Sequence, residues 1–184
     1  AITSFGIASI AGLWLSLLSS PWLILVGVAA VTAAWGYTGG KNPYGYSGLG
    51  EVSVFIFFGL TATVGTFYAQ TGRVTALSVL CAVPMGLLAC AILAVNNLRD
   101  RAQDELVGKR TLAVRLGDAK ARKGFVVLLV IAHLSALATF VPWSILTLAV
   151  LPLTISISRA VMSGASGAEL IPLLGRTGKL QMFF

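Results

Sequence analysis

The chain has 184 residues, of which 57% are hydrophobic and only 10% are charged, and its formal net charge is +7. Soluble domains carry about 25% charged residues, and a fold of this size cannot remove so much apolar surface from water. Together with a mean hydropathy of +0.92, these values exclude an ordinary soluble domain and indicate a polytopic membrane protein.

The predicted elements are apolar helices. A transmembrane helix needs about 20 mainly apolar residues, with about 17 as the lower limit. The chain contains six apolar runs of 14 to 22 residues and the start of a seventh. We expect helices over residues 2–18, 22–35, 52–68, 74–95, 125–141 and 144–157, and another that begins near residue 170. The expected fold is all-α, a transmembrane helical bundle that forms a single domain over residues 1–184.

Basic residues are concentrated on one side of this topology. Because consecutive antiparallel helices alternate in direction, residues 37–50, 98–124 and 159–169 lie on the same side of the membrane. These segments contain ten basic residues, namely Lys41, Arg99, Arg101, Lys109, Arg110, Arg115, Lys120, Arg122, Lys123 and Arg159. The opposite connections contain only Arg73. This asymmetry predicts that the basic side is cytoplasmic, and charge confined to short loops argues against a nucleic-acid partner.

Oxygen-bearing side chains gather at the end of the fourth run. If the helix continues through it, Asn97, Asp100 and Asp104 sit at i, i+3 and i+7, on one face. Mg²⁺ prefers oxygen ligands and is commonly held by one or two carboxylates together with water and substrate phosphates. The pattern indicates a site for magnesium and a diphosphate, although a bare pair of spaced carboxylates is more often a solvated, salt-bridged helix end.

The residues that follow strengthen this interpretation. Gly108 is expected to end the helix. Lys109 and Arg110 come directly after it, and both can neutralise phosphate oxygens.

Two segments resemble the UbiA superfamily of intramembrane prenyltransferases. Residues 96–118, NNLRDRAQDELVGKRTLAVRLGD, resemble its second aspartate-rich motif. The Asn at the first position and the GKRTLAVRLG tail resemble the 1,4-dihydroxy-2-naphthoate polyprenyltransferase branch. Residues 37–72, YTGGKNPYGYSGLGEVSVFIFFGLTATVGTFYAQTG, support the same branch. The resemblance covers nearly the whole chain and implies a nine-helix bundle, of which the chain would span the third helix to the start of the ninth.

The resemblance also implies roles for individual residues. Asn97, Asp100 and Asp104 would bind Mg²⁺, and the two aspartates together with Lys109 are the expected catalytic residues. The expected substrate-binding residues are Asn96, Asn97, Arg99, Lys109, Arg110, Tyr37, Lys41, Tyr46 and Glu51. The last four are expected in one loop on the cytoplasmic side, where they would help to close the site and place an aromatic acceptor.

The implied activity is transfer of a polyprenyl group from polyprenyl diphosphate to 1,4-dihydroxy-2-naphthoate, with loss of CO₂, in a bacterial cytoplasmic membrane. The family's first aspartate-rich motif, of N-D-x-x-D type, is absent from the chain. We expect it upstream, because the chain begins without Met inside an apolar run and ends while still apolar. The piece alone is therefore expected to be inactive.

Three alternatives remain open at this point. The acceptor could be 4-hydroxybenzoate, homogentisate, haem or a chlorophyll precursor, within the same superfamily. The chain could be a transporter, but transporters place polar groups near the bilayer midplane, whereas this chain concentrates them at one interface. It could also be a structural membrane subunit, a function that leaves the Asn97, Asp100 and Asp104 pattern unexplained.

Overall fold

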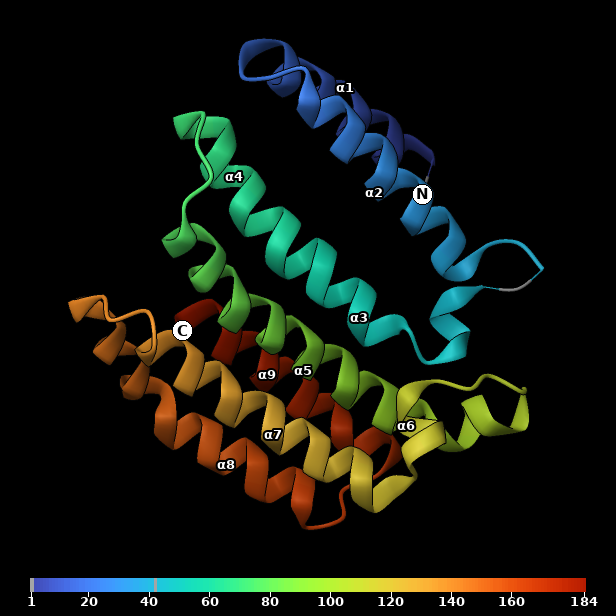
Figure 1. The fold of residues 1–184 in the computed structure, drawn as a ribbon. Coiled ribbons are helices and arrows are strands. Elements are labelled where there is room, and N and C mark those ends of the chain that lie inside the picture. Colours follow the sequence, from blue (N-terminus) through green and yellow to red (C-terminus); the bar gives the residue numbers. More distant parts are fainter. Residues whose placement is uncertain (1, 42) are drawn as a thin grey trace.

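The computed structural model describes residues 2–41 and 43–184, and all regular structure in these residues is helical, as expected. In chain order the elements are α1 (Ile2–Leu18), α2 (Trp22–Thr38), η1 (Tyr44–Ser47), α3 (Gly50–Val54), η2 (Phe55–Thr61), α4 (Ala62–Thr71), α5 (Ala76–Leu106), α6 (Leu112–Leu116), α7 (Asp118–Leu137), η3 (Pro142–Val150), α8 (Leu151–Met162), η4 (Gly167–Leu170) and α9 (Ile171–Phe183). Because α3, η2 and α4 are continuous, as are η3 with α8 and η4 with α9, the described residues form seven long rods (Figure 1).

Helix α5 is the central element of the bundle. It packs against α7 and α9 on one side and against the η2–α4 rod on the other (Figure 1). The fully buried core side chains come from α5 and the helices that follow it, and include Leu88, Val95, Leu129, Ile157 and Leu180. The residues of α5 that carry the polar motif are therefore attached to the best-packed part of the molecule.

The start and the length of α5 explain where its polar end lies. Thr75 caps the helix, because its hydroxyl accepts a hydrogen bond from the Ser78 amide at 3.0 Å. The helix then runs for 31 residues, about 46 Å at 1.5 Å per residue. A hydrocarbon core is about 30 Å thick, so roughly the last ten residues of α5 extend beyond it. These are the residues that include Asn97, Asp100 and Asp104.

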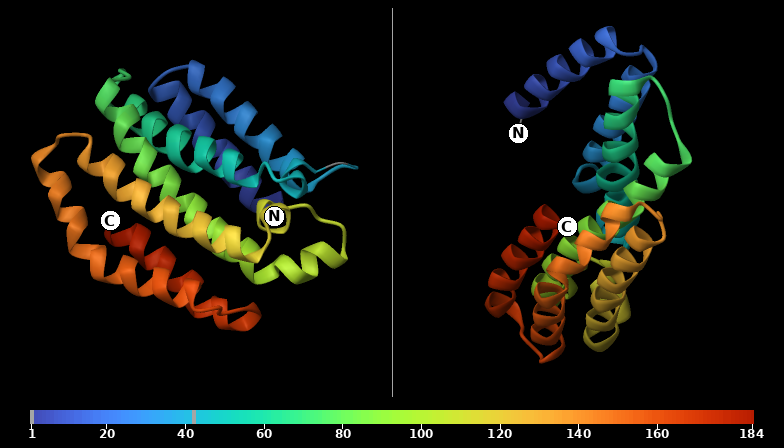
Figure 2. Two further views of the ribbon diagram at one scale, coloured as in Figure 1. Left: turned by 60° about the horizontal axis from the view of Figure 1, so that its bottom comes forward. Right: turned by 90° about the vertical axis from the view of Figure 1, so that its left-hand side faces the viewer.

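Helices α1 and α2 form a pair that diverges from the rest of the bundle. In the right-hand view of Figure 2, α1 stands away from the helices of the core. At the turn between α1 and α2, the Ser19 hydroxyl donates to the Ala69 carbonyl at 2.9 Å, and the Tyr68 hydroxyl donates to Ser20 at 3.1 Å. These bonds fix the pair to α4 at one end.

The connections alternate between the two ends of the bundle, as the sequence predicts. One end carries the connections at residues 39–41 with 43–49, 107–117 and 163–166, and the other carries those at 19–21, 72–75 and 138–141 (Figure 1). Among the described residues, three rods are long and apolar enough to cross a membrane, namely Gly50–Thr71, Ala76–Leu106 and Pro142–Met162. Thr3–Leu18 and Trp22–Thr38 are shorter apolar helices. The chain is a multi-pass membrane protein.

Two helix boundaries correct an expectation about the site. Helix α2 continues to Thr38, three residues beyond the predicted end, because the Gly39 amide still donates to the Trp35 carbonyl at 2.8 Å. Tyr37 therefore belongs to the last turn of α2, and Glu51 belongs to the first turn of α3. The prediction that both lie in a loop is wrong, although the two helix ends flank that loop.

The last predicted spans also differ in detail. Helix α7 begins at Asp118, seven residues before the predicted start, and ends at Leu137. Phe140 then has a positive φ of 54°, so the chain turns before the expected residue 141. The next rod begins with the 3₁₀ segment Pro142–Val150 and becomes an α-helix from Leu151.

Two glycines allow η2 and α5 to approach closely. A Cβ on Gly59 would lie 2.5 Å from the Cα of Gly86, and a Cβ on Gly86 would lie 2.7 Å from the Phe55 ring. Backbone cannot yield as a flexible side chain can, so overpacking at this point must shift a helix. The tight approach coincides with the π-helical segment η2, a geometry that often marks functional sites.

We expect Gly59→Ala to destabilise the protein by about 1–3 kcal/mol, the usual cost of overpacking a close-packed core. Thermal unfolding of the protein in detergent measures this loss of stability. Gly65→Ala is the matched control, since Gly65 is helical in the same rod and a Cβ there meets nothing within 4 Å. The control should be neutral or stabilising, and equal destabilisation by both variants would contradict the packing argument.

Candidate functional site

Helix α5 brings the three predicted oxygen ligands onto one face. It remains α-helical through Leu106, so Asn97, Asp100 and Asp104 keep the spacing of i, i+3 and i+7. Asn97 and Asp104 are buried, with 9% and 6% of their surface exposed, and Asp100 is half-buried. The predicted arrangement of these three side chains on α5 is confirmed, while their role as ligands stays a prediction.

The end of α5 places Lys109 beside Asp104. Gly108 adopts a left-handed conformation with φ of 75°, and its amide donates to the Glu105 carbonyl at 3.2 Å. The Lys109 amide donates to the Asp104 carbonyl at 2.8 Å, which completes a Schellman motif. The chain therefore folds back over the last turn, and Lys109 Nζ lies 3.3 Å from Asp104 Oδ1. The predicted helix end at Gly108 is confirmed.

Both candidate carboxylates are paired with basic side chains. Arg99 donates two hydrogen bonds to Asp100, from Nε to Oδ1 at 2.7 Å and from a terminal guanidinium nitrogen to Oδ2 at 2.6 Å. Lys109 pairs with Asp104, whose side chain is only 8% exposed. The two basic side chains therefore balance the charges of the two carboxylates. Arg99 and Lys109, which were predicted to bind substrate, contact the predicted metal ligands Asp100 and Asp104.

The turn between α2 and α3 closes over this helix end. The Arg110 amide donates to the Tyr46 carbonyl at 2.8 Å, and Lys109 Nζ lies 4.7 Å from the centre of the Tyr46 ring, in cation–π geometry. Gly48 has a φ of 78°, and a Cβ there would lie 2.9 Å from Arg115 Nε. Tyr46, Lys109 and Arg110 are therefore brought together, as the sequence predicts for one end of the bundle.

Glu51 connects the start of α3 directly to the polar face of α5. Asn97 Nδ2 donates a hydrogen bond to Glu51 Oε1 at 2.9 Å. The second carboxylate oxygen, Oε2, is buried and has no hydrogen-bond partner among the described residues. The Cys90 thiol donates to the Glu51 backbone carbonyl, with a distance of 3.1 Å. This contact between α3 and α5 was not predicted, because it joins residues that are 46 positions apart.

The remaining predicted residues lie around this centre. Tyr37 packs edge-on against Tyr44, with the ring centres 5.5 Å apart. Asn96 is half-buried, Arg110 has an exposed side chain, and Lys41 is exposed on the turn next to residue 42, which lies outside the described residues. The structure places Lys41 at the correct end of the bundle without bringing it into the cluster.

A second ion-pair cluster at this end was missed by the sequence reasoning. The buried Arg122 side chain binds Asp118 through two bonds, at 2.6 and 3.0 Å, and also donates to the Val161 carbonyl. The guanidinium of Arg122 lowers the pKa of Asp118 below its usual value. Arg101 of α5 approaches the same carboxylate at 3.9 Å. The spacing of four residues between Asp118 and Arg122 could have predicted this ion pair from the sequence. The cluster links α7 to α5 through Arg101 and to α8 through Val161.

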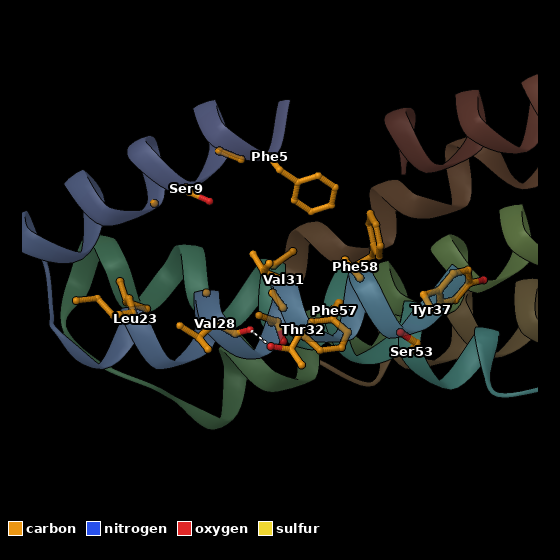
Figure 3. A pocket seen from close by; sticks show the side chains of 18 of the residues that line it. Phe5, Ser9, Leu23, Val28, Val31, Thr32, Tyr37, Ser53, Phe57 and Phe58 are labelled. Carbon is orange, nitrogen blue, oxygen red and sulfur yellow. Dashed lines mark hydrogen bonds between the residues drawn. The ribbon is translucent and has the colours of Figure 1, made fainter. Parts of the chain in front are cut away.

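An apolar cavity of about 1140 Å³ extends toward the same end of the bundle, and the residues that line it come from the part of the chain before α5. It lies between α1, α2 and the α3–η2 rod, and Figure 3 shows side chains from all three directed into it. Tyr37 and Ser53 lie at one end and Leu23 at the other (Figure 3). From residue 23 to residue 37 the helix rises about 21 Å. At the polar end, the Tyr44 hydroxyl donates to the Ala33 carbonyl at 2.7 Å and lies 3.0 Å from Ser53 Oγ.

The donor set fits Mg²⁺ that is shared with a substrate. No group of three or more His, Cys, Asp or Glu residues close enough to hold a metal ion occurs in residues 2–41 and 43–184. Mg²⁺ seldom uses such a closed protein cage and is usually bound by one or two carboxylates together with substrate phosphates. Two aspartates and the amide oxygen of Asn97 on one face match that use, and nearby Lys109 suits a diphosphate.

Apolar rods with a charged cluster at one end, and an elongated apolar cavity that extends toward the same end, define a polytopic membrane protein with an interfacial polar site. The model of the UbiA prenyltransferase family matches residues 1–168. The chain belongs to this family, which confirms the resemblance of its two motifs.

Individual relatives are similar over most of this chain. A Mycobacterium tuberculosis protein named 1,4-dihydroxy-2-naphthoate octaprenyltransferase is 47% identical over 97% of this chain and 62% of its own length. The Escherichia coli protein of the same name is 39% identical over 85% of this chain and 52% of its own length. The chicken UbiA prenyltransferase domain-containing protein 1 is 35% identical over 83% and 47%, respectively. The chain thus spans less than two thirds of these relatives. No solved structure matches it.

Proposed function

We propose that the complete protein transfers a polyprenyl group from polyprenyl diphosphate to 1,4-dihydroxy-2-naphthoate, with Mg²⁺ as cofactor. The observation that carries the proposal is the position of Lys109 next to Asp104, on the helix face that also bears Asn97 and Asp100, at the end of the bundle toward which a long apolar cavity extends. A polyprenyl diphosphate needs those two environments side by side. The relatives named above support naphthoate as the acceptor.

The polar cluster would bind the diphosphate. Asn97, Asp100 and Asp104 would hold Mg²⁺, which supplies positive charge to the departing diphosphate. Lys109, Arg110, Arg99 and Asn96 would bind its oxygens. Arg99 and Lys109 already lie on the carboxylates, at 2.6 and 3.3 Å. Binding then amounts to an exchange, in which the carboxylates turn to the cation and the basic groups turn to the phosphate oxygens.

The chemistry follows from this distribution of charge. As the allylic carbon–oxygen bond breaks, its electron pair stays with the diphosphate oxygen, where Lys109 and Arg99 stabilise the added charge. The allylic cation is shielded from water by the apolar cavity. The electron-rich ring carbon that bears the carboxylate attacks the cation and forms the new carbon–carbon bond. The bond between this carbon and the carboxylate then breaks, CO₂ leaves, and the electron pair of the broken bond stays with the ring. The immediate product is therefore a demethylmenaquinol, the reduced form of a demethylmenaquinone.

The turn between α2 and α3 would form the acceptor side. Tyr46 packs against Lys109, Glu51 contacts Asn97, and Tyr37 lines the cavity at this end of the bundle, while Lys41 lies exposed on the same turn. We propose that these residues close the site and place the aromatic ring. The concentration of basic residues at this end supports a cytoplasmic orientation in a bacterial membrane.

Complementation tests the proposal in cells. The full open reading frame that encodes this chain is expressed in a bacterial strain that cannot prenylate 1,4-dihydroxy-2-naphthoate, and quinones are extracted and identified by mass spectrometry. Restored menaquinone is the expected result. Restoration of ubiquinone alone, in a strain unable to prenylate 4-hydroxybenzoate, would assign a different acceptor, and restoration of neither would contradict the enzyme proposal.

The cavity leads to a prediction about the prenyl chain. Gly27 lines the cavity on α2, and a Cβ there meets nothing within 4 Å. Gly27→Phe should fill the space and lower kcat/KM for long polyprenyl diphosphates relative to geranyl diphosphate by about tenfold or more, the scale on which apolar pockets discriminate. Gly6→Phe on α1 is the control, since Gly6 is equally open but lies outside the cavity lining. An equal effect of both variants on both substrates would contradict the assignment of the tail.

A further inference from the structure

Asn97 is held by an interaction that fixes the direction of its amide. Its Nδ2 donates to Glu51 Oε1 at 2.9 Å, and the side chain is largely buried, so the amide has little freedom to rotate. A carboxylate accepts hydrogen bonds and cannot donate them. Contact with Glu51 is therefore favourable only when the amide nitrogen points toward α3 and the amide oxygen points away from it.

That direction matters on this helix face. Asn97 shares the face with Asp100 and Asp104, and only the amide oxygen can serve as a ligand to Mg²⁺. If the amide rotated by half a turn, it would present N–H groups to the cation. Hydrogen bonds that orient a ligand from behind commonly change metal affinity by about 10–100-fold when they are removed.

We propose that Glu51 is a positioning residue for Asn97, which it holds so that Asn97 Oδ1 remains available to the metal–diphosphate complex. The inference rests on the proposed metal site and extends it to α3. The contact between α3 and α5 would then orient the Asn97 amide, which α5 alone does not do. Because Glu51 lies in the first turn of α3, shortly after the segment that carries Tyr46, the same contact would couple the position of that segment to the orientation of the metal ligand.

An exchange of donor and acceptor tests this directly, with the variants Glu51→Gln, Asn97→Asp and both together. In Asn97→Asp two carboxylates face each other across the α3–α5 contact, so the ligand is repelled from its position. In Glu51→Gln the new amide can donate as well as accept, so Asn97 no longer has one favoured orientation. The double variant restores a single favourable pair. Its new amide on α3 donates to the new carboxylate on α5, and the other oxygen of that carboxylate stays available to the metal.

The readout is binding of Mn²⁺ to the full-length protein in detergent in the presence of inorganic diphosphate, followed by electron paramagnetic resonance. We expect Asn97→Asp to weaken binding about tenfold or more and Glu51→Gln to weaken it to a smaller degree, whereas the double variant should recover to within a few-fold of wild type. Gln103→Glu, which adds one charge to an exposed position on α5, controls for charge alone. It should change binding much less than Asn97→Asp does.

The outcomes separate this inference from the proposed function. Wild-type binding with no rescue in the double variant would overturn the positioning role alone. An absence of wild-type Mn²⁺ binding would overturn both the metal site and the inference. Binding with rescue, in a protein that transfers no prenyl group, would support the positioning role and contradict the proposed reaction.

Discussion

Replacement of Asp104 by Asn is expected to reduce kcat/KM for prenyl transfer by about 10²-fold or more, the scale on which removal of one electrostatic contact to a transition state acts. Asp104 is almost completely buried, and Lys109 is its ion-pair partner. The substitution keeps the shape of the side chain and removes its charge, so the loss reports on the charge. The ratio kcat/KM is obtained from the transfer of labelled prenyl groups in membranes, measured over a range of Mg²⁺ concentrations.

The neighbouring residue supplies a matched control. Glu105 is next in the sequence, is 65% exposed and contacts Arg101 at 3.6 Å, away from the face that carries Asp104. Glu105→Gln makes the same chemical change at a solvated position and should leave kcat/KM within about threefold, since exposed ion pairs contribute roughly 0–1 kcal/mol. Similar losses in the two variants would show that general charge at the helix end, and not Asp104, is what matters.

Replacement of Lys109 by Met has the second large expected effect. Lys109 pairs with Asp104 and lies 4.7 Å from the centre of the Tyr46 ring, and in the proposed complex it turns to the diphosphate. A hydrogen bond to a charged group contributes about 1.5–3 kcal/mol, which corresponds to roughly 10–150-fold in kcat/KM. Because Lys109 would contact the diphosphate both when it binds and when it departs, we expect a higher KM for polyprenyl diphosphate together with a lower kcat, both measured by steady-state kinetics.

Lys120→Met is the control for this variant. Lys120 is exposed near the start of α7, at the same end of the bundle, so its removal changes the net charge by the same amount. A KM that rises equally in both variants would indicate general attraction of the anionic substrate by a basic surface. A rise confined to Lys109→Met would support the specific contact, and no rise in either would contradict the proposed diphosphate site.

Much of the fold can be predicted from the sequence, because the bilayer imposes a length and a composition on each helix. The runs at 2–18 and 74–95 predict α1 and the membrane part of α5 closely. The polar end of α5 is also predictable, since an α-helix that continues from a buried span carries Asn97, Asp100 and Asp104 on one face until Gly108 ends it.

Other features depend on contacts that sequence patterns do not encode. Three glycines lie in residues 36–40, and any of them could end helix α2. The helix continues past Gly36 to Thr38, and the Gly39 amide still donates to the Trp35 carbonyl. The bond between Asn97 and Glu51 requires α3 to lie against α5, and the π-helical η2 coincides with the close approach of Gly59 and Gly86. The Arg99–Asp100 pair was equally unexpected, since adjacent residues on a helix do not normally face each other.

The most direct test of the proposed activity is transfer from radiolabelled polyprenyl diphosphate to 1,4-dihydroxy-2-naphthoate by membranes that contain the full-length protein, with Mg²⁺ and with EDTA. We expect a labelled, decarboxylated, prenylated product that forms with Mg²⁺, disappears with EDTA and is lost in Asp100→Asn. Asp100 is held by Arg99 on the proposed metal face, so this variant tests the site as well as the reaction. No labelled product with any aromatic acceptor, or undiminished product in EDTA and in Asp100→Asn, would contradict the proposed activity.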